Sequence, residues 1–409
     1  LLQLVSRRER LLREILYSSV PHARVLILFL VLRNAVGATR KRYFLMDLWE
    51  HIVLLNMPLF ISKQKNQQWY VDLPLLLPVI ALMSIGFIMV SSASFSFGDH
   101  RLGDELFFFK RHLAYLAMGL VTLMICFFIP SAFWSKYARF WMLIAIVLLI
   151  LVLVPGVGHE VNGSRRWLSF AGLTLQVSEL AKVATVVFLA AYLEQYRSTL
   201  VVGWQHFFKL MAVIGLLTIL LISEPDFGSV VVLVGTFMAM LFLGGARLRE
   251  YGLVISIAGM TLWWLKDAAP YRVARLTTFL DPWSDQFDSG YQLTQSLIAF
   301  GRGEWFGVGL GQSVQKMLYL PEAHTDFVFA IFAEEFGFIG VIFLIGLYCL
   351  IVIRIFGLSR VAIAQHSWYA AFVLIGFGLL ISGQTFINLG VNAGLLPTKG
   401  LTLPFVSYG

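Results

Sequence analysis

Residues 321–353 read PEAHTDFVFAIFAEEFGFIGVIFLIGLYCLIVI, and in this stretch a polar loop meets a long apolar run that begins at Asp326. A helix of about 20 apolar residues crosses a bilayer, so the run 326–353 is predicted to span a membrane. It is also long enough to tilt or to extend beyond the bilayer. The stretch places a carboxylate at the membrane edge, where a charge is costly to hold, so Asp326 is a candidate functional residue.

The composition of the chain indicates a membrane protein. Hydrophobic residues make up 59% of the chain and charged residues 13%, and the mean hydropathy is +0.80. A soluble domain carries about 25% charged residues, so an all-α polytopic membrane protein is predicted. The net charge of +8 does not indicate nucleic acid, because Lys and Arg are scattered between apolar runs, as topology determinants are. Cys126 and Cys349 each lie inside an apolar run, which predicts buried thiols and no disulfide.

Nine apolar runs have about the length of a spanning helix. They occupy residues 72–95, 113–130, 139–157, 179–196, 207–223, 227–245, 250–267, 326–353 and 369–391. The fifth and sixth runs are separated only by Glu224-Pro225-Asp226. Because Pro225 cannot continue a helix, a tight turn is predicted between them.

The distribution of Lys and Arg predicts which loops are cytoplasmic. If Lys63 and Lys65 are cytoplasmic, so are the alternate junctions that carry Lys136 and Arg139, Arg197 and Lys209, Arg247 and Arg249, and Arg354 and Arg360. The outer, periplasmic set is then 96–112, 158–178, the turn at 224–226 and the long loop 268–325. Basic residues also occur in the first two outer loops, so the charge bias is followed incompletely.

The two ends of the chain differ from this pattern. Residues 1–56 contain no run long enough to span and no signal-peptide layout, so they are predicted to be mistranslated upstream sequence or a dispensable basic tail. A surface amphipathic helix around Arg7–Leu16 is the alternative. We expect 1–70 to be a cytoplasmic extension and 71–409 a membrane domain with the periplasmic loop 268–325. The chain stops after an outer-side loop, which predicts that a last helix is missing.

The loop 268–325 is far longer than an ordinary helix connection, and such loops are usually functional or disordered. Its aromatic residues favour a folded substructure: Trp283, Tyr291, Phe300, Trp305, Phe306 and Tyr319. The run 301–311 is dense in glycine. Such a backbone either approaches a ligand and exposes N–H groups to anions, or forms tight turns, and the spacing alone does not separate these two interpretations.

His324, Thr325 and Asp326 precede the next span directly. Thr325 is a suitable N-cap for that helix. Asp326 would then lie in the first turn, where the helix dipole stabilises a carboxylate and lowers its pKa, which weakens it as a base. Partial burial or the neighbouring Glu322 would raise the pKa instead. The sequence leaves this balance open.

The outer loop 158–178 contains Arg165, Arg166 and Trp167, against the usual charge bias. Paired arginines suit phosphate or diphosphate, because the guanidinium fork binds such oxygens through two hydrogen bonds. Trp167 is either an interfacial anchor or a stacking surface for a sugar. Farther along, Glu179 and Lys182 are three residues apart on a predicted helix, so we expect a structural ion pair inside the bundle.

Other acidic residues are predicted at membrane depth. Asp226 flanks the turn between two spans, and Glu334 and Glu335 lie within the span that Asp326 begins. Adjacent acids at such depth need a partner or a water-filled cavity. The spacing of His324, Asp326 and Glu334 is not that of a dedicated metal site, so no protein-only metal site is predicted. A divalent cation shared with a diphosphate substrate stays open.

Several motifs together resemble the SEDS family (shape, elongation, division and sporulation). They are GSRRW at 163–167, QVSELAK at 176–182, EPDFG at 224–228, DPW at 281–283, GYQLTQS at 290–296, PEAHTDF at 321–327, GLLPTKG at 394–400 and LPFVSYG at 403–409. GRGE at 301–304 and LPTK at 396–399 look more like the division branch than the elongation branch. The matches cover about 70–409 in order, and residues 1–56 have no counterpart.

The resemblance implies a ten-helix bundle in the bacterial inner membrane, of which this chain lacks the last helix, with a cytoplasmic N-terminus. It implies polymerisation of lipid II, an undecaprenyl-diphosphate-linked disaccharide pentapeptide, into glycan strands at the division septum. A class B penicillin-binding protein and other divisome membrane proteins would be its partners. Asp326 matches the family's essential acid and Trp167 its important tryptophan.

This resemblance gives the candidate site residues their expected tasks. Asp326 would act as general base on the acceptor hydroxyl. Arg165, Arg166 or Lys399 would stabilise the departing diphosphate, and His324 and Glu322 would lie beside them in the substrate site.

Two alternatives stay open. A lipid II flippase would suit the intramembrane acids Glu179, Glu334 and Glu335. A scaffold that recruits the penicillin-binding protein would not depend on the charge of Asp326.

Overall fold

A computed structural model describes residues 71–103, 106–161, 164–170, 173–200, 204–247, 249–252, 254, 256, 279, 281–288, 290–397 and 400–408. They belong to one compact unit, Trp69–Gly409. Its elements are α4 (Leu73–Leu102), α5 (Phe107–Phe128), α6 (Ser131–Lys136), α7 (Ala138–Leu153), β1 (Gly158–Val161), β2 (Ser164–Phe170), β3 (Leu173–Gln176), α8 (Val177–Leu200), α9 (Trp204–Ser223), α10 (Phe227–Leu243), α13 (Tyr291–Gly303), α14 (Val328–Ala364) and α15 (Trp368–Asn392). A helix is present at every predicted span except 250–267, most of which lies outside the described residues. The predicted extension 1–70 lies wholly outside them.

The helical bundle has the properties of a multi-pass membrane protein. Among the described residues, five helices are long and apolar enough to cross a membrane: α4, α5, α9, α14 and α15. The apolar helices α7 and α10 are shorter. Large apolar side chains on α5, such as Val121, Met124 and Phe128, are exposed, as lipid-facing residues are. The prediction of buried thiols was wrong, because Cys126 and Cys349 are free and exposed on the helix surface.

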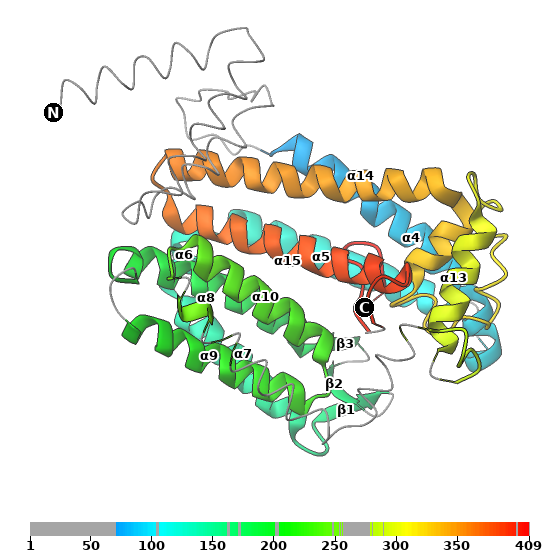
Figure 1. The fold of residues 1–409 in the computed structure, drawn as a ribbon, viewed down its shortest axis with the longest axis horizontal. Helices are drawn as coiled ribbons and strands as arrows, with labels where there is room; N and C mark the ends of the chain where they lie inside the picture. The colour runs from blue at the N-terminus through cyan, green and yellow to red at the C-terminus, as the bar shows by residue number, and fades with distance from the viewer. Residues whose placement is uncertain are drawn as a thin grey trace, which may run out of the picture. The chain divides into compact units, whose positions relative to one another are not determined.

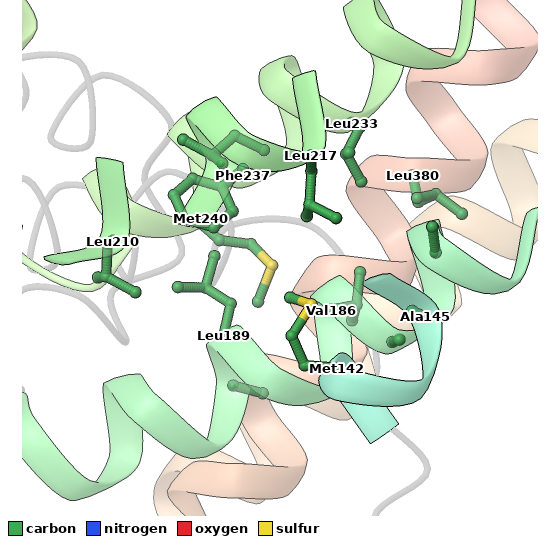
Figure 2. Packing of buried hydrophobic residues seen from close by; sticks show 14 of the residues in the cluster. Met142, Ala145, Val186, Leu189, Leu210, Leu217, Leu233, Phe237, Met240 and Leu380 are labelled. Carbon is green, nitrogen blue, oxygen red and sulfur yellow. The ribbon is translucent and has the colours of Figure 1, made fainter. Parts of the chain in front are cut away.

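Two hydrophobic clusters hold the bundle together. One joins α7, α8, α9, α10 and α15, and Figure 2 shows its Met142, Leu189, Phe237 and Met240 converging between the helices. The other joins α4, α13, α14 and the C-terminal segment. Helix α15 contributes side chains to both clusters, so it connects the two parts of the bundle.

A three-stranded antiparallel sheet, which the sequence did not lead us to expect, follows α7. Strand β2 is central and pairs with both β1 and β3. The pair Val161 and Ser164 closes the first hairpin around Asn162-Gly163, whose own structure lies outside the described residues. Asn-Gly between strand-forming residues is the strongest short hairpin signal, so this feature was accessible from the sequence.

Helix α14 is broken at Gly337, where φ is +64°. The chain after α13 fills the break: the amide of Phe338 donates to the carbonyl of Glu304 at 2.9 Å. A Cβ on Gly303 would lie 2.1 Å from the carbonyl oxygen of Ala333, and a Cβ on Gly307 would lie 2.1 Å from that of Glu335. These glycines therefore let the backbone of residues 303–307 lie directly against the backbone of α14. The close approach that the glycines allow is to α14 and not to a ligand.

The elements predicted to be periplasmic gather at one end of the bundle, and α6 lies at the other end (Figure 1). The C-terminal residues return to the first of these ends. The side-chain amide of Asn388 in α15 donates to the carbonyl of Leu401, and the hydroxyl of Tyr348 donates to the carbonyl of Pro404. The amide of Tyr408 donates to the carbonyl of His324 at 3.1 Å. This segment thus packs directly beside the loop that carries Asp326.

Candidate active site

Asp326 lies in a tight turn just before α14. The amides of Thr325 and Phe327 each donate to the carbonyl of Glu322 at 3.2 Å, and the Thr325 hydroxyl donates to the Glu322 carboxylate at 2.8 Å. The prediction of Thr325 as an N-cap was wrong: Phe327 occupies that position without a side-chain cap, because the Thr325 hydroxyl closes the turn instead. Asp326 consequently precedes the helix and does not lie in its first turn.

Two buried asparagines of α15 fix the position of Asp326. The side-chain amides of Asn388 and Asn392 donate to its backbone carbonyl at 3.0 Å and 3.1 Å. Both side chains are buried, at 2% and 0% exposure. We did not predict this pair from the sequence, although two amides four residues apart near the end of an apolar span indicate a buried polar contact.

The carboxylate of Asp326 has the properties of a base that works near neutral pH. It is half-buried, and it accepts no hydrogen bond from any described residue. Burial first, and then the charge of Glu322, raise the pKa of Asp326 to about 7, while Arg166 opposes the rise. The sequence left open whether the pKa of Asp326 is lowered by the helix dipole or raised by burial and Glu322, and in the structure it is raised. Gly400 leaves space for the group, since a Cβ there would lie 2.8 Å from Oδ2.

Arg166 lies at a β-bulge of the sheet at this end of the bundle. Glu160 pairs with Arg165 and His159 pairs with Trp167, so Arg166 is the extra residue in β2. A bulge redirects a side chain out of the strand's alternation. The Arg166 guanidinium donates to the carbonyl of Glu224 at 3.0 Å and to that of Pro225 at 2.7 Å. A guanidinium has five N–H donors, so about three remain uncommitted within the described part of the chain.

The predicted turn between α9 and α10 is present and carries two buried acids. Asp226 caps α10 by accepting from the amide of Ser229 at 3.2 Å, and its second oxygen is buried without a partner among the described residues. Glu224 is fully buried, and burial, followed by the charge of Asp226, raises its pKa to about 8. Asp226 also raises the pKa of Asp326, which ties this turn electrostatically to the candidate base.

The other candidate substrate residues have separate environments. His324 is buried with its ring 4.7 Å from that of Phe108, and burial lowers its pKa. Trp167 is half-buried in β2 opposite Gln176. Arg165 does not join Arg166: its side chain forms an exposed ion pair with Glu160 at 3.0 Å. Lys399 lies outside the described residues.

The intramembrane ionisable residues on α8 are paired. Lys182 is fully buried and contacts Glu179 at 2.7 Å, as their spacing predicts. Its ammonium also donates to Gln384 of α15 at 2.9 Å, and the Gln384 amide donates to the carbonyl of Thr402 at 3.0 Å. The pair thereby connects α8, α15 and the C-terminal segment, and it acts as a structural link.

Glu334 and Glu335 are also committed to partners. Glu334 contacts Arg302 at 3.0 Å, and the Ser313 hydroxyl donates to it. Glu335 contacts Lys316 at 2.8 Å. These pairs attach the last turn of α13 and the chain that follows it to the first turns of α14. They order the segment that leads into the Asp326 turn.

Metal ligands are not grouped in the part of the chain that the structure describes. No three or more His, Cys, Asp or Glu side chains there are placed to share an ion.

Comparison with known proteins identifies the family. The family model FtsW/RodA/SpoVE, described as a cell cycle protein, matches residues 73–409. The chain belongs to the FtsW/RodA/SpoVE family. This assignment confirms the resemblance inferred from the motifs.

Two relatives in the FtsW/RodA/SpoVE family are close to this chain along most of its length. One, from Saccharophagus degradans, is named probable peptidoglycan glycosyltransferase FtsW; it is 48% identical over 360 residues, covering 88% of this chain and 92% of the relative. A protein of the same name from Coxiella burnetii is 46% identical over 349 residues, covering 85% and 94%.

Solved structures show the same fold. A chain from a structure described as "structural coordination of polymerization and crosslinking by a peptidoglycan synthase complex" has a TM-score of 0.67 and 28% identity, covering 84% of this chain and 93% of that one. The rod shape determining protein RodA of Thermus thermophilus has a TM-score of 0.61 and 27% identity, covering 84% and 92%. This member of the FtsW/RodA/SpoVE family is therefore a multi-pass membrane protein with the bundle of its relatives.

Proposed function

We infer that this protein is a peptidoglycan glycosyltransferase that polymerises lipid II into glycan strands. The observation that carries the inference is the half-buried Asp326, whose pKa is raised to about 7, at the predicted outer end of a membrane bundle. The names of the chain's relatives support the same reaction. So does the contact from α15 that holds Asp326 in place.

In the proposed reaction Asp326 is the general base. Its carboxylate takes the proton of the acceptor 4-hydroxyl, and the hydroxyl oxygen forms a bond to the anomeric carbon of the donor. The bond between that carbon and the diphosphate oxygen breaks, and the diphosphate departs with the electron pair. Base catalysis of this kind contributes about 10²–10⁴-fold to a rate when the pKa of the base lies near the working pH.

Arg166 is proposed to stabilise the departing diphosphate. Its uncommitted N–H donors match phosphate oxygens in geometry and charge. Two backbone carbonyls hold the guanidinium in position before substrate arrives, which lowers the cost of reorganisation in the transition state. Lys399 and Trp167 are proposed to contribute further charge and a stacking surface, and a cation carried by the diphosphate would assist in the same way as Arg166.

We further propose that the enzyme works with a class B penicillin-binding protein and other divisome membrane proteins at the septum. It would lie in the bacterial inner membrane with its N-terminus in the cytoplasm. The similarity to a chain of a peptidoglycan synthase complex supports a crosslinking partner. The basic junctions at the α6 end of the bundle support the orientation.

The pH dependence of polymerisation tests the role of Asp326. Only the ionised carboxylate accepts a proton, and its pKa is raised to about 7, so activity should fall as the pH drops through that value. At about pH 5 only about one carboxylate in a hundred is ionised, so the rate should fall about a hundredfold. The measurement is initial rates of glycan formation from lipid II across this range. An acid limb near the ordinary aspartate value of about 4 would contradict the assignment.

Replacement of Arg166 tests the diphosphate site. Arg166→Gln should lower kcat about 10²–10³-fold, because a charge that acts on the leaving group is lost. The variant should also move the acid limb to higher pH, because Arg166 holds the pKa of Asp326 down. Arg165→Gln is the matched control: its exposed ion pair with Glu160 is worth at most about 1 kcal/mol. Equal losses in both variants would show that the two arginines act only through the general charge of this loop.

A further inference from the structure

Glu224 is a buried acid that the proposed reaction does not use. Its side chain has 0% exposure, and both carboxyl oxygens are buried without a hydrogen-bond donor among the described residues. An ionised carboxylate without donors is costly to hold in such a place. The geometry therefore indicates a neutral carboxylic acid at neutral pH.

Within the part of the chain that the structure describes, the charged groups that act on Glu224 come from the same turn and from β2. Asp226 raises its pKa and Arg166 lowers it, and burial is the largest influence, so the pKa is about 8. Arg166 is bound to the backbone carbonyls of Glu224 and Pro225 and makes no ion pair with the Glu224 carboxyl group. The Arg166 guanidinium thus lies beside an acid with which it forms no ion pair.

We propose that Glu224 is a positioning residue, whose neutral form leaves the Arg166 guanidinium without a carboxylate partner, so that its free donors face the diphosphate and Asp326. This inference rests on the proposed function. When Glu224 loses its proton, the new carboxylate competes with the diphosphate for Arg166. It also adds negative charge beside Asp226 and Asp326. Both effects lower activity at alkaline pH, and the descending limb of the pH profile belongs to Glu224.

The test compares Glu224→Gln with wild type, each bound to the penicillin-binding protein, in lipid II polymerisation from about pH 6 to about pH 9. Glutamine keeps the shape and neutrality of the acid but cannot ionise. At about pH 9 only about one tenth of an acid with pKa 8 keeps its proton, so the variant should be about tenfold faster than wild type there. The matched control is Glu160→Gln on β1, which should follow the wild-type profile. An unchanged descending limb in Glu224→Gln would overturn the proposal.

A second measurement is independent of polymerisation. Infrared difference spectra of the wild-type protein should show two protonated carboxyl bands, one from Asp326 that disappears near pH 7 and one from Glu224 that disappears near pH 8. Only the band that disappears near pH 8 should be absent from Glu224→Gln. A protein with this band but no polymerase activity would refute the proposed function and leave the protonation state of Glu224 standing. A wild-type protein that polymerises lipid II but lacks the band at neutral pH would refute the inference about Glu224 alone.

Discussion

Asp326→Asn should abolish lipid II polymerisation while the protein still folds. The amide has the shape of the carboxylate but cannot accept the proton of the acceptor hydroxyl, so we expect a loss of about 10²–10⁴-fold. The contacts that hold this residue use its backbone carbonyl, which the substitution leaves in place. Initial rates with the partner protein bound measure the effect.

The stability of the same variant separates a chemical defect from a folding defect. The folded-state pKa of Asp326 is raised from 3.8 to about 7, so between these values the folded state holds a proton that the unfolded state releases. Wild-type stability therefore decreases as the pH rises through this window. Asn lacks this dependence, so Asp326→Asn should be as stable as wild type near pH 4 and more stable near pH 8.

The matched control is Asp288→Asn, which makes the same change at an exposed position of the segment between α10 and α14, which also carries Asp326. It should retain wild-type rates. Polymer formation at the wild-type rate by Asp326→Asn, or an equal loss in the control, would contradict the role of Asp326 as base.

Gly307→Ala should unfold the end of the bundle that carries Asp326. Gly307 has a φ of +80°, and a Cβ there would lie 2.1 Å from the carbonyl oxygen of Glu335. A left-handed conformation costs a residue with a side chain about 1–2 kcal/mol, and overpacking against a backbone atom adds about 1–3 kcal/mol. We expect a loss of about 2–5 kcal/mol in the free energy of unfolding. The Asp326 turn should lose its position with it.

Gly346→Ala, in the same helix α14, is the matched control. Apart from the helix's own backbone, a Cβ at Gly346 would have no atom of the described residues within 4 Å, and the φ of Gly346 is not in the left-handed region. Alanine is favoured over glycine in a helix interior by about 0.5–1 kcal/mol, so this variant should be as stable as wild type or slightly more stable. Thermal or detergent-induced unfolding of both variants measures the difference. Similar stability of the two would contradict the described packing of the 303–309 chain into the break of α14.

The membrane helices were predictable because their signal is local. Apolar length and the Pro225 turn are properties of short windows of sequence, and the structure has helices or turns at those places. Pairing between Glu179 and Lys182 was predictable for the same reason, because both residues lie on one helix face.

Features that depend on distant parts of the chain were not predictable. The bulge at Arg166 is set by the pairing of β1 with β2. The Arg166 side chain binds the turn at Glu224, which lies in a different part of the sequence. The break of α14 at Gly337 exists because the chain after α13 fills it. The rise in the pKa of Asp326 comes mainly from burial, which requires the packed structure.

Transport of lipid II, the alternative function, receives less support from the acids that first favoured it. Glu179, Glu334 and Glu335 each form an ion pair with a Lys or Arg side chain, at 2.7 Å, 3.0 Å and 2.8 Å. Acids in such ion pairs stabilise the folded structure and are poorly suited to carry protons across the bundle. Asp326, at the predicted outer end, differs from them because its pKa is raised by burial and by a neighbouring acid.

The most direct test of the central claim is polymerisation of lipid II in detergent by the purified protein bound to the class B penicillin-binding protein that we propose as its partner. Detergent removes the two leaflets between which a flippase works, so only an enzyme yields a product there. We expect long glycan strands from the wild-type complex and none from the Asp326→Asn complex. Absence of strands from the wild-type complex, or equal strands from both, would contradict the assignment of Asp326 as the base of a glycosyltransferase.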